Sequence, residues 1–217
     1  MPGYRVLHSH DASHFLAVAG SYLYAREVQD HLILGACESL GAGFHPDAPP
    51  KMVYAERSGE ILGVMMRIDS RRIALSGWPK ETWSTLAGEL ASLTPRPRTL
   101  IGPQSLMAEL IPVLTSLIDC QPKAIMDQNI MSLSQVTAPL ETRGEMRIAN
   151  AQDSSLVSRW LMEFTDESLP MERLEPQRAR ELAEGKINRQ QVYLWCVEDT
   201  PVCTAQVSRP PRHAISI

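Results

Sequence analysis

The pattern of apolar residues predicts the same order of elements twice along the chain, and this repetition constrains the fold more than any single motif. In each half, apolar residues at helical spacing are followed by two short apolar runs around a turn and by a further strand. The two predicted hairpins consist of the runs 52–55 and 61–66, and the runs 192–197 and 202–207. A chain with this repetition is expected to fold as two lobes.

One alignment relates the two halves. It places Ile61 opposite Val202, in the second strand of each predicted hairpin. The same alignment places Ala12 opposite Asp153, where a helix is predicted to begin in each half, and Ser76 opposite Ser216 to within one position. We therefore expect an α/β fold of two tandem lobes, each a mixed, mostly antiparallel sheet flanked by helices. The alternative is coincidence, because two helices and a hairpin are a common order and few aligned residues are identical.

The other elements follow from apolar spacing and from the positions of proline and glycine. In the first half we predict helices over 12–40, from Pro79 and over 105–117, and strands at 73–75, 100–101 and 124–136. In the second half we predict a strand at 146–149, a helix over 153–164 capped by Asp153 or Ser154, a helix over 175–184 ended by Gly185, and a strand at 214–217. The stretch 138–145 is the predicted linker between an N-terminal lobe over 1–137 and a second lobe over 146–217.

The second lobe is predicted to be incomplete. After Ser76 the first half continues with a helix, a strand, another helix and a long strand, whereas only Ile217 follows Ser216. A last strand without a following element would leave an unpaired sheet edge. We therefore expect the chain to be truncated within its second lobe.

Composition narrows the class of protein. The chain has 217 residues, of which 44% are hydrophobic and 21% charged, as in ordinary globular proteins, and its formal net charge is −4. Mild acidity disfavours nucleic-acid and anionic-membrane partners, and no apolar run approaches the ~20 residues that cross a bilayer. The scattered cysteines and the lack of a signal sequence favour a cytoplasmic protein with reduced thiols. No Cys or His spacing predicts a metal site.

The second half resembles the opening of a GNAT acetyltransferase domain, through the hairpin strands Tyr193–Trp195 and Pro201–Ala205 behind a strand and two helices. The first half resembles the degenerate GNAT-like lobe of two-lobed bacterial acetyltransferases, through Ala25–Gly35 and through Ile101–Pro103 before a helix. The resemblance implies transfer of an acetyl group from acetyl-CoA to a primary amine on a small molecule. It is compatible with a homo-oligomer.

In this family the acetyl-CoA site follows the fourth strand. There, a turn of the form Arg/Gln-x-x-Gly-x-Gly/Ala opens a helix whose N–H groups hold the pyrophosphate. No such motif occurs in this sequence. The corresponding turn of the first half, Gly77-Trp78-Pro79-Lys80, has one glycine, a bulky tryptophan and a proline without an N–H group. We therefore expect the chain to lack an acetyl-CoA site and to be inactive alone.

The second hairpin carries a candidate acceptor pocket. A turn at Asp199–Thr200 would pair Cys196 with Cys203, so that alternation separates an apolar face from a mixed aromatic and polar face. The apolar face is predicted to consist of Leu194, Cys196, Cys203, Ala205 and Val207, and the mixed face of Tyr193, Trp195, Thr204 and Gln206. Aromatic walls with a few polar groups suit a small-molecule site. Ordinary packing of the two aromatic side chains against helices would produce the same pattern.

The resemblance adds residues from the segment between the two helices of the second lobe, where family members contact the acceptor. These are Phe164 at the end of the predicted helix, and Asp166 and Glu167 in the predicted loop after it. A carboxylate there could bind a cationic amine or accept its proton. Solvated carboxylates without a role are the alternative, and no catalytic residue is identified.

Two functions of other classes remain open. A non-catalytic module with a degenerate GNAT fold could bind a small molecule or a protein through the mixed face. An interaction protein could complete its open sheet with a strand from another chain.

Overall fold

The computed structural model describes residues 3–9, 11–41, 43, 46–137, 142–168 and 173–207. The chain divides into two compact units, unit 1 up to Ser132 and unit 2 from Leu133. Unit 1 contains a five-stranded mixed sheet, and unit 2 contains a three-stranded antiparallel sheet. The predicted α/β class is therefore confirmed.

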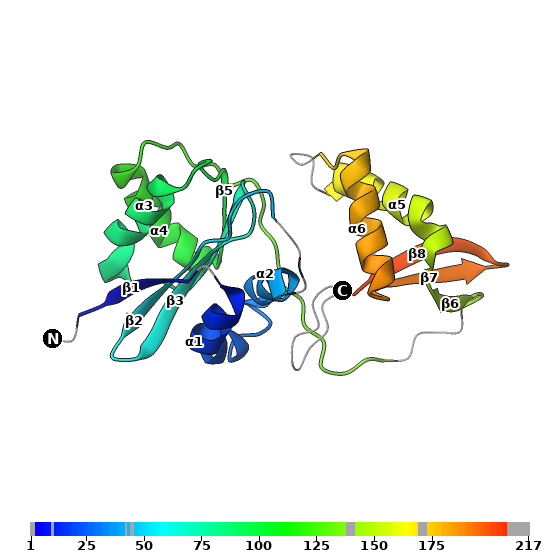
Figure 1. Ribbon diagram of the computed structural model, residues 1–217, viewed down its shortest axis with the longest axis horizontal. Helices are drawn as coiled ribbons and strands as arrows, with labels where there is room; N and C mark the ends of the chain where they lie inside the picture. The colour runs from blue at the N-terminus through cyan, green and yellow to red at the C-terminus, as the bar shows by residue number, and fades with distance from the viewer. Residues whose placement is uncertain are drawn as a thin grey trace. The chain divides into compact units, whose positions relative to one another are not determined.

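Unit 1 follows the order strand, two helices, three strands, helix, strand and helix (Figure 1). Its elements are β1 (Arg5–Ser9), α1 (Ala12–Tyr24), α2 (His31–Gly41), β2 (Met52–Arg57), β3 (Glu60–Arg67), β4 (Arg72–Ser76), α3 (Trp83–Ser92, after a 3-10 turn at Lys80–Thr82), β5 (Thr99–Ile101) and α4 (Gln104–Leu117). The strands lie in the order β1-β2-β3-β4-β5, and every neighbouring pair is antiparallel except β4 and β5. The predicted hairpin, third strand and short strand are confirmed as β2–β3, β4 and β5.

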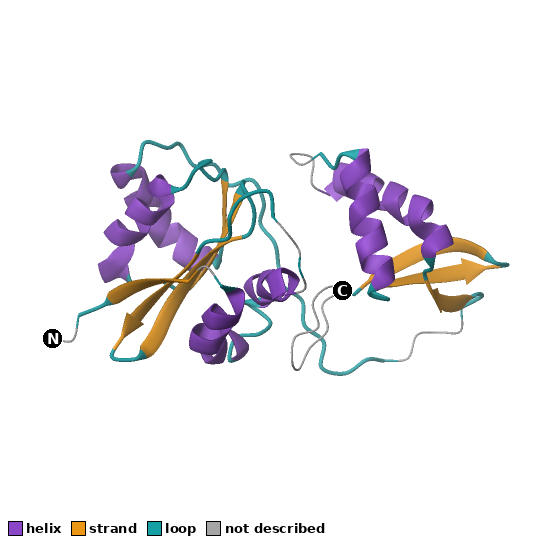
Figure 2. Ribbon diagram, viewed as in Figure 1, coloured by secondary structure: helices purple, strands orange, loops and turns teal. Residues whose placement is uncertain are grey.

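Helices cover both faces of the sheet in unit 1 (Figure 2). The helices α1 and α2 pack against the face that contains Tyr54, through a cluster that includes Phe15. The helices α3 and α4 pack against the face that contains Val53 and Ala55, through a cluster that includes Leu86. Because successive residues of a strand point to opposite faces, β2 contributes side chains to both clusters and is buried on both sides.

Unit 2 contains β6 (Glu145–Ile148), α5 (Ser154–Ser168, after a 3-10 turn at Ala151–Asp153), α6 (Pro176–Asn188), β7 (Val192–Val197) and β8 (Thr200–Gln206). The strand order is β6-β7-β8. Both helices lie on one side of this sheet (Figure 2). They pack Val157, Ala183 and Ile187 against Val192 and Leu194 of β7.

The hairpin pairing of unit 1 recurs in unit 2. The β2–β3 pairing shifts by one position between Ala55 and Glu56, and the β7–β8 pairing shifts in the same way between Trp195 and Cys196. Matching the two bulges places Ala55 opposite Trp195, which corrects by one position the sequence alignment that placed Ile61 opposite Val202. The corrected alignment also matches the tight turn at 58–59 with the turn at 198–199, and every residue of both turns has a positive φ. The right-handed twist of the strands favours such turns in hairpins. The two hairpins thus share register, bulge and turn.

The helical segment predicted over 12–40 consists of two helices, as the predicted order of two helices before a hairpin requires. The mostly polar stretch 25–30 separates them, and the Asp30 carbonyl accepts the first hydrogen bonds of α2. Two predictions about helix ends in unit 2 are wrong in detail. The cap before α5 is Asn150, whose side chain accepts from the Gln152 N–H, while Asp153 accepts from the Asn150 N–H and closes a capping box. The helix α6 continues through Gly185 to Asn188.

The long strand predicted over 124–136 is also wrong. These residues are described, but they contain no regular secondary structure and all of them are exposed. Alternating apolar residues specify a strand only when a neighbouring strand and a covering layer are available, and among the described residues none pairs with this segment. The strand predicted at 214–217 lies outside the described residues.

Candidate functional site

The sequence-predicted acceptor residues occupy three different places in unit 2. Phe164 lies on α5 with 61% of its surface exposed, and Glu167 is exposed in the last turn of the same helix. Asp166 and Glu167 are therefore helical, and the prediction that they lie in a loop is wrong because α5 extends to Ser168. Tyr193 and Trp195 lie on β7, and Thr204 and Gln206 lie on β8.

The predicted register of the second hairpin is wrong by one position. The turn consists of Glu198 and Asp199, and the bulge after Trp195 shifts the pairing again, so that Trp195 lies opposite Cys203 rather than Thr204. A slip of a single position moves every side chain of a strand to the other face of the sheet.

The corrected register separates the residues of the predicted mixed face. Tyr193 and Trp195 lie opposite Ala205 and Cys203, on the face of the sheet that α5 and α6 do not cover. Thr204 and Gln206 lie opposite Leu194 and Val192, on the face that the helices do cover. The Thr204 hydroxyl donates to the Tyr193 carbonyl oxygen at 3.2 Å. The four residues therefore do not form one pocket wall.

The indole of Trp195 is held against the backbone that precedes β6. Its Nε1 donates to the Arg143 carbonyl oxygen at 3.1 Å. Gly144 has a φ of +116°, and a Cβ there would lie 2.5 Å from Nε1 of Trp195. Glycine at this position therefore lets the indole approach the backbone closely enough to donate this hydrogen bond.

A half-buried ion pair fixes the start of α5. The guanidinium of Arg147 donates to both carboxylate oxygens of Asp153, at 2.7 and 2.8 Å. This pair raises the pKa of Arg147 and lowers the pKa of Asp153, with the Asn150 N–H contributing to the second shift. The two groups satisfy each other and secure β6 to the helix, which is a structural role.

The carboxyl end of α5 is acidic. Glu163, Asp166 and Glu167 lie in its last two turns, and no basic residue lies in the last turn. Glu163 forms an ion pair with Arg159, whose Nε lies 3.8 Å from Glu163 Oε1, and both side chains are mostly exposed. Acidic groups at a helix C-terminus face the negative end of the macrodipole, which is unfavourable, so a bound cation would be stabilised there.

The turn after β4 in unit 1 is closed by packing. Gly77 has a φ of +57°, and a Cβ there would lie close to the hydroxyl of Tyr22, which donates to the Ser76 carbonyl oxygen. Trp78 and Trp83 are buried, and the Trp83 indole donates to the Trp78 carbonyl oxygen. These contacts fill the turn with side chains, and the Trp78 Nε1–H is buried there without a hydrogen-bond partner.

A polar group without full hydrogen bonding lies buried beside this turn, and the sequence analysis missed it. Asp30 is 3% exposed and Ser76 is fully buried, and Asp30 Oδ2 lies 3.4 Å from Nε of Arg26. Within the described residues, Arg26 Nε, Asp30 Oδ2 and Ser76 Oγ are buried and have no hydrogen-bond partner. Burial raises the pKa of Asp30 against the opposing effects of Ser76 and Arg26. The signal in the sequence was the charged residues Arg26, Glu27 and Asp30, which interrupt an otherwise apolar helical run.

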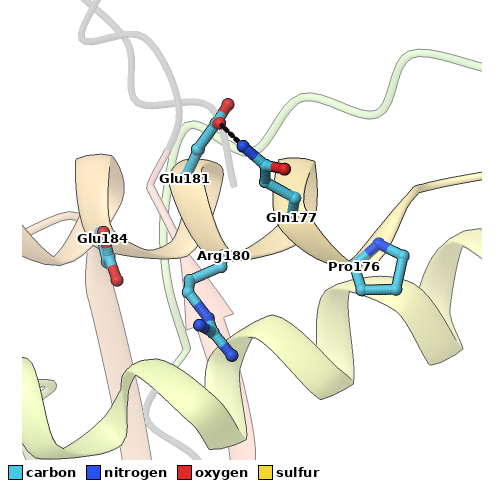
Figure 3. A pocket seen from close by; sticks show the side chains of 5 residues that line it. All are labelled: Pro176, Gln177, Arg180, Glu181 and Glu184. Atoms are coloured by element: carbon cyan, nitrogen blue, oxygen red, sulfur yellow. Dashed lines mark hydrogen bonds between the residues drawn. The ribbon is translucent and has the colours of Figure 1, made fainter.

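Each unit carries a hollow on its surface. A hollow of about 510 Å³ runs along α6 and is lined by Pro176, Gln177, Arg180, Glu181 and Glu184. Figure 3 shows that Glu181 and Gln177 point together while Arg180 extends to the opposite side, so these polar groups do not converge. A hollow of about 180 Å³ between α3 and α4 is bordered by the ion pair of Lys80 and Glu109. Neither hollow combines enclosure with converging polar groups.

Within the described ranges, no group of three or more His, Cys, Asp or Glu side chains could hold a metal ion. None of the described helices is long and apolar enough to span a membrane. Comparison with known proteins finds no matching family model, no similar curated protein and no similar solved structure.

Proposed function

We propose that this chain is a two-lobed GNAT-type acyltransferase chain, with the parent activity of moving an acetyl group from acetyl-CoA to a primary amine. Unit 1 is a lobe that does not bind the donor, and unit 2 carries acceptor-side residues. We expect no acetyl transfer by these residues alone, because their sequence contains no turn of the form Arg/Gln-x-x-Gly-x-Gly/Ala.

The observation that carries this proposal is the order of elements in unit 1. The resemblance implies a strand, two helices, a hairpin, a fourth strand, and then a helix, and unit 1 follows this order before a strand parallel to β4 and a last helix. The register and bulge that β2–β3 shares with β7–β8 support a duplicated lobe in unit 2. A fold hosts many functions, so this argument reaches the family's activity by analogy.

The turn after β4 supports a non-donor role for unit 1. In a donor lobe, free N–H groups at the start of the next helix would face the pyrophosphate. Here Pro79 contributes no N–H, the Thr82 N–H donates to the Pro79 carbonyl oxygen, and Trp78 fills the space.

The acidic end of α5 supports an acceptor role for unit 2. A primary amine is a cation at neutral pH, and it must lose a proton before it attacks the thioester. Asp166 and Glu167 could bind the ammonium form electrostatically, and the exposed ring of Phe164 lies one turn away on the same helix.

The test titrates the chain with acetyl-CoA and, separately, with spermidine. Binding is measured as heat in calorimetry and as changes in amide chemical shifts. We expect saturable spermidine binding that shifts the amides at 163–168, and no saturable heat with acetyl-CoA. The double variant Asp166→Asn/Glu167→Gln should weaken spermidine binding about tenfold, or ~1.4 kcal/mol. The control Glu184→Gln also removes a negative charge, but from α6 rather than from the end of α5. It should have little effect on spermidine binding.

Two results would refute parts of this proposal. Saturable acetyl-CoA binding that shifts the amides at 77–82 would mean that unit 1 holds the donor after all. Spermidine binding that is absent, or equal in the double variant and the wild type, would remove the acceptor role. The function would then be a non-catalytic binding module, which the closed turn after β4 also favours.

A further inference from the structure

Three exposed arginines lie on neighbouring loops of unit 1, where β4 and β5 begin. Arg71 directly precedes β4, and Arg96 and Arg98 lie in the loop before β5. The Arg71 carbonyl oxygen accepts from the backbone N–H groups of Arg98 and Thr99, at 2.8 and 2.9 Å, so the two loops lie side by side. Within the described residues, none of the three side chains takes part in a hydrogen bond or an ion pair. We call these three side chains the arginine patch.

A fourth arginine, which is buried, holds the two loops together. Arg67 is 3% exposed, and its guanidinium donates to the Asp69 carbonyl oxygen, in the loop before β4, at 3.1 Å. The same guanidinium donates to the carbonyl oxygens of Thr94 and Pro95, in the loop before β5, at 3.2 and 2.9 Å. Because these contacts fix the backbone on both sides of the patch, a ligand would bind there with a smaller loss of conformational entropy than on free loops.

The carboxylates beside the patch are already engaged. Asp69 forms an ion pair with the Arg72 guanidinium at 2.6 Å and also accepts from the backbone N–H of Arg72 at 2.8 Å. Asp47 accepts from the N–H and hydroxyl groups of Ser70, at 2.8 and 2.5 Å. These contacts are local and tie down the loop before β4. They leave the guanidinium groups of the patch available to an anion from outside the chain.

The composition of the two loops predicts an anionic partner. The stretches 67–72 and 94–98 contain five arginines and one acidic residue, so this part of the surface is positive on a chain whose formal net charge is −4. A guanidinium forms paired, charge-assisted hydrogen bonds with a carboxylate. No arginine of the patch lines either surface hollow described above. An extended polymer that meets several guanidinium groups at once therefore fits the patch better than an enclosed small molecule.

We propose that the arginine patch binds an acidic segment of a partner polypeptide, whose carboxylates pair with Arg71, Arg96 and Arg98. Nucleic acid fits less well, because the two loops contain no aromatic side chain on which a base could stack. A nucleic acid also carries charge along its whole length, so the acidic remainder of the chain would repel it, whereas a short acidic segment meets only the patch.

This inference goes beyond the proposed function. The patch lies where β4 begins, whereas the turn at which acetyl-CoA binding was tested above follows the end of β4. It also uses no residue of unit 2, so it is independent of the acidic end of α5.

The binding test uses a fluorescein-labelled peptide of alternating Glu and Asp, about eight residues long, which can extend over roughly 25 Å. We expect saturable binding to the whole chain in fluorescence anisotropy, with shifts of the amide signals at 70–72 and 96–99. A peptide of the same length made of Gln and Asn should not bind. Added salt should weaken binding of the acidic peptide, because exposed ion pairs are screened.

Two variants locate the binding site. Arg71→Gln/Arg98→Gln should weaken peptide binding about tenfold, or ~1.4 kcal/mol, because two charge-assisted contacts are lost. Arg96→Gln alone should weaken it about threefold, or ~0.7 kcal/mol. All three side chains are exposed, so both variants should unfold at the wild-type temperature. The control Arg173→Gln/Arg180→Gln removes the same charge from exposed positions of unit 2 and should change binding less than about twofold.

Three outcomes would overturn the inference. The first is no binding of the acidic peptide up to about 1 mM at low ionic strength. The second is equal weakening by the patch variants and by the control, which would mean attraction to net charge without a site. The third is tighter binding of a single-stranded oligouridine of equal charge, which would make the partner a nucleic acid. Failure of the spermidine or acetyl-CoA titration would leave these measurements unaffected, so the two proposals fail separately.

Discussion

Replacing Gly63 with alanine should destabilise unit 1 strongly, because two backbone segments meet at this residue. A Cβ on Gly63 would lie 2.7 Å from the Gly77 carbonyl oxygen and 2.7 Å from the Cα of Trp78. Both are backbone atoms, so neither can move aside by changing a rotamer. Overpacking costs about 1–3 kcal/mol where side chains can adjust. We expect the upper end of that range, about 3 kcal/mol, which at roughly 4 °C per kcal/mol lowers the melting temperature of unit 1 by about 12 °C.

The matched control is Gly88→Ala, since no described atom lies within 4 Å of a Cβ at this position of α3. Alanine is the better helix former, so this variant should stabilise unit 1 by about 0.5–1 kcal/mol. Hydrogen exchange read by mass spectrometry separates the two units: Gly63→Ala should accelerate exchange in β2 to β4 and leave β7 and β8 unchanged. If Gly63→Ala matched the wild type within about 0.5 kcal/mol, the close approach of β3 to the turn after β4 would be refuted.

Three further predictions concern titratable groups. Burial raises the pKa of Cys37 to about 12. Ellman's reagent should therefore modify the exposed Cys120 and Cys203 quickly and leave Cys37 unmodified. Fast modification of Cys37 in the folded chain would contradict this burial. Asp153→Ala removes the ion pair and the capping box and should cost unit 2 about 2–3 kcal/mol in urea unfolding. Because the pKa of Asp153 lies below its usual 3.8, this cost should be present above pH ~4 and decrease as pH falls through the lowered pKa. A cost that grows as pH falls below ~4 would contradict the assignment. Burial raises the pKa of Asp30 above 3.8, so the wild type should lose stability relative to Asp30→Asn as pH rises through that raised pKa, and a difference that moves the other way would mean that Arg26 outweighs burial.

Apolar spacing predicted most elements because the core of unit 1 follows it closely. The hairpin β2–β3, the strand β4 and the helix α4 are each bounded by glycine, proline or charged residues. The three strands are buried on both faces, and α4 turns one apolar face inward. The segment 124–136 carries a similar alternation but has no neighbouring strand among the described residues. Periodicity reports what a segment could bury, whereas pairing depends on the rest of the chain.

The candidate site was predicted less well because it depended on register. Turn residues at 198 and 199 and a bulge after Trp195 together decide which face each residue of β8 occupies. Nothing in the local alternation distinguishes this register from one shifted by a single position, since β8 mixes small, polar and apolar side chains on both faces. The buried Asp30 group was missed for a different reason: its members are brought together by a helix–helix turn and the end of a distant strand.

The repeated register also bears on how the aromatic residues of β7 should be interpreted. From the sequence, Tyr193 and Trp195 fitted a ligand pocket and a packing face equally well. Their counterparts in unit 1, Val53 and Ala55, are fully buried beneath α3 and α4. The indole Nε1 of Trp195 moreover donates to the Arg143 carbonyl oxygen, so this N–H already has a partner within the chain. These counterparts favour a packing role for Tyr193 and Trp195 over a ligand pocket, and the acidic end of α5 becomes the stronger candidate for binding an amine.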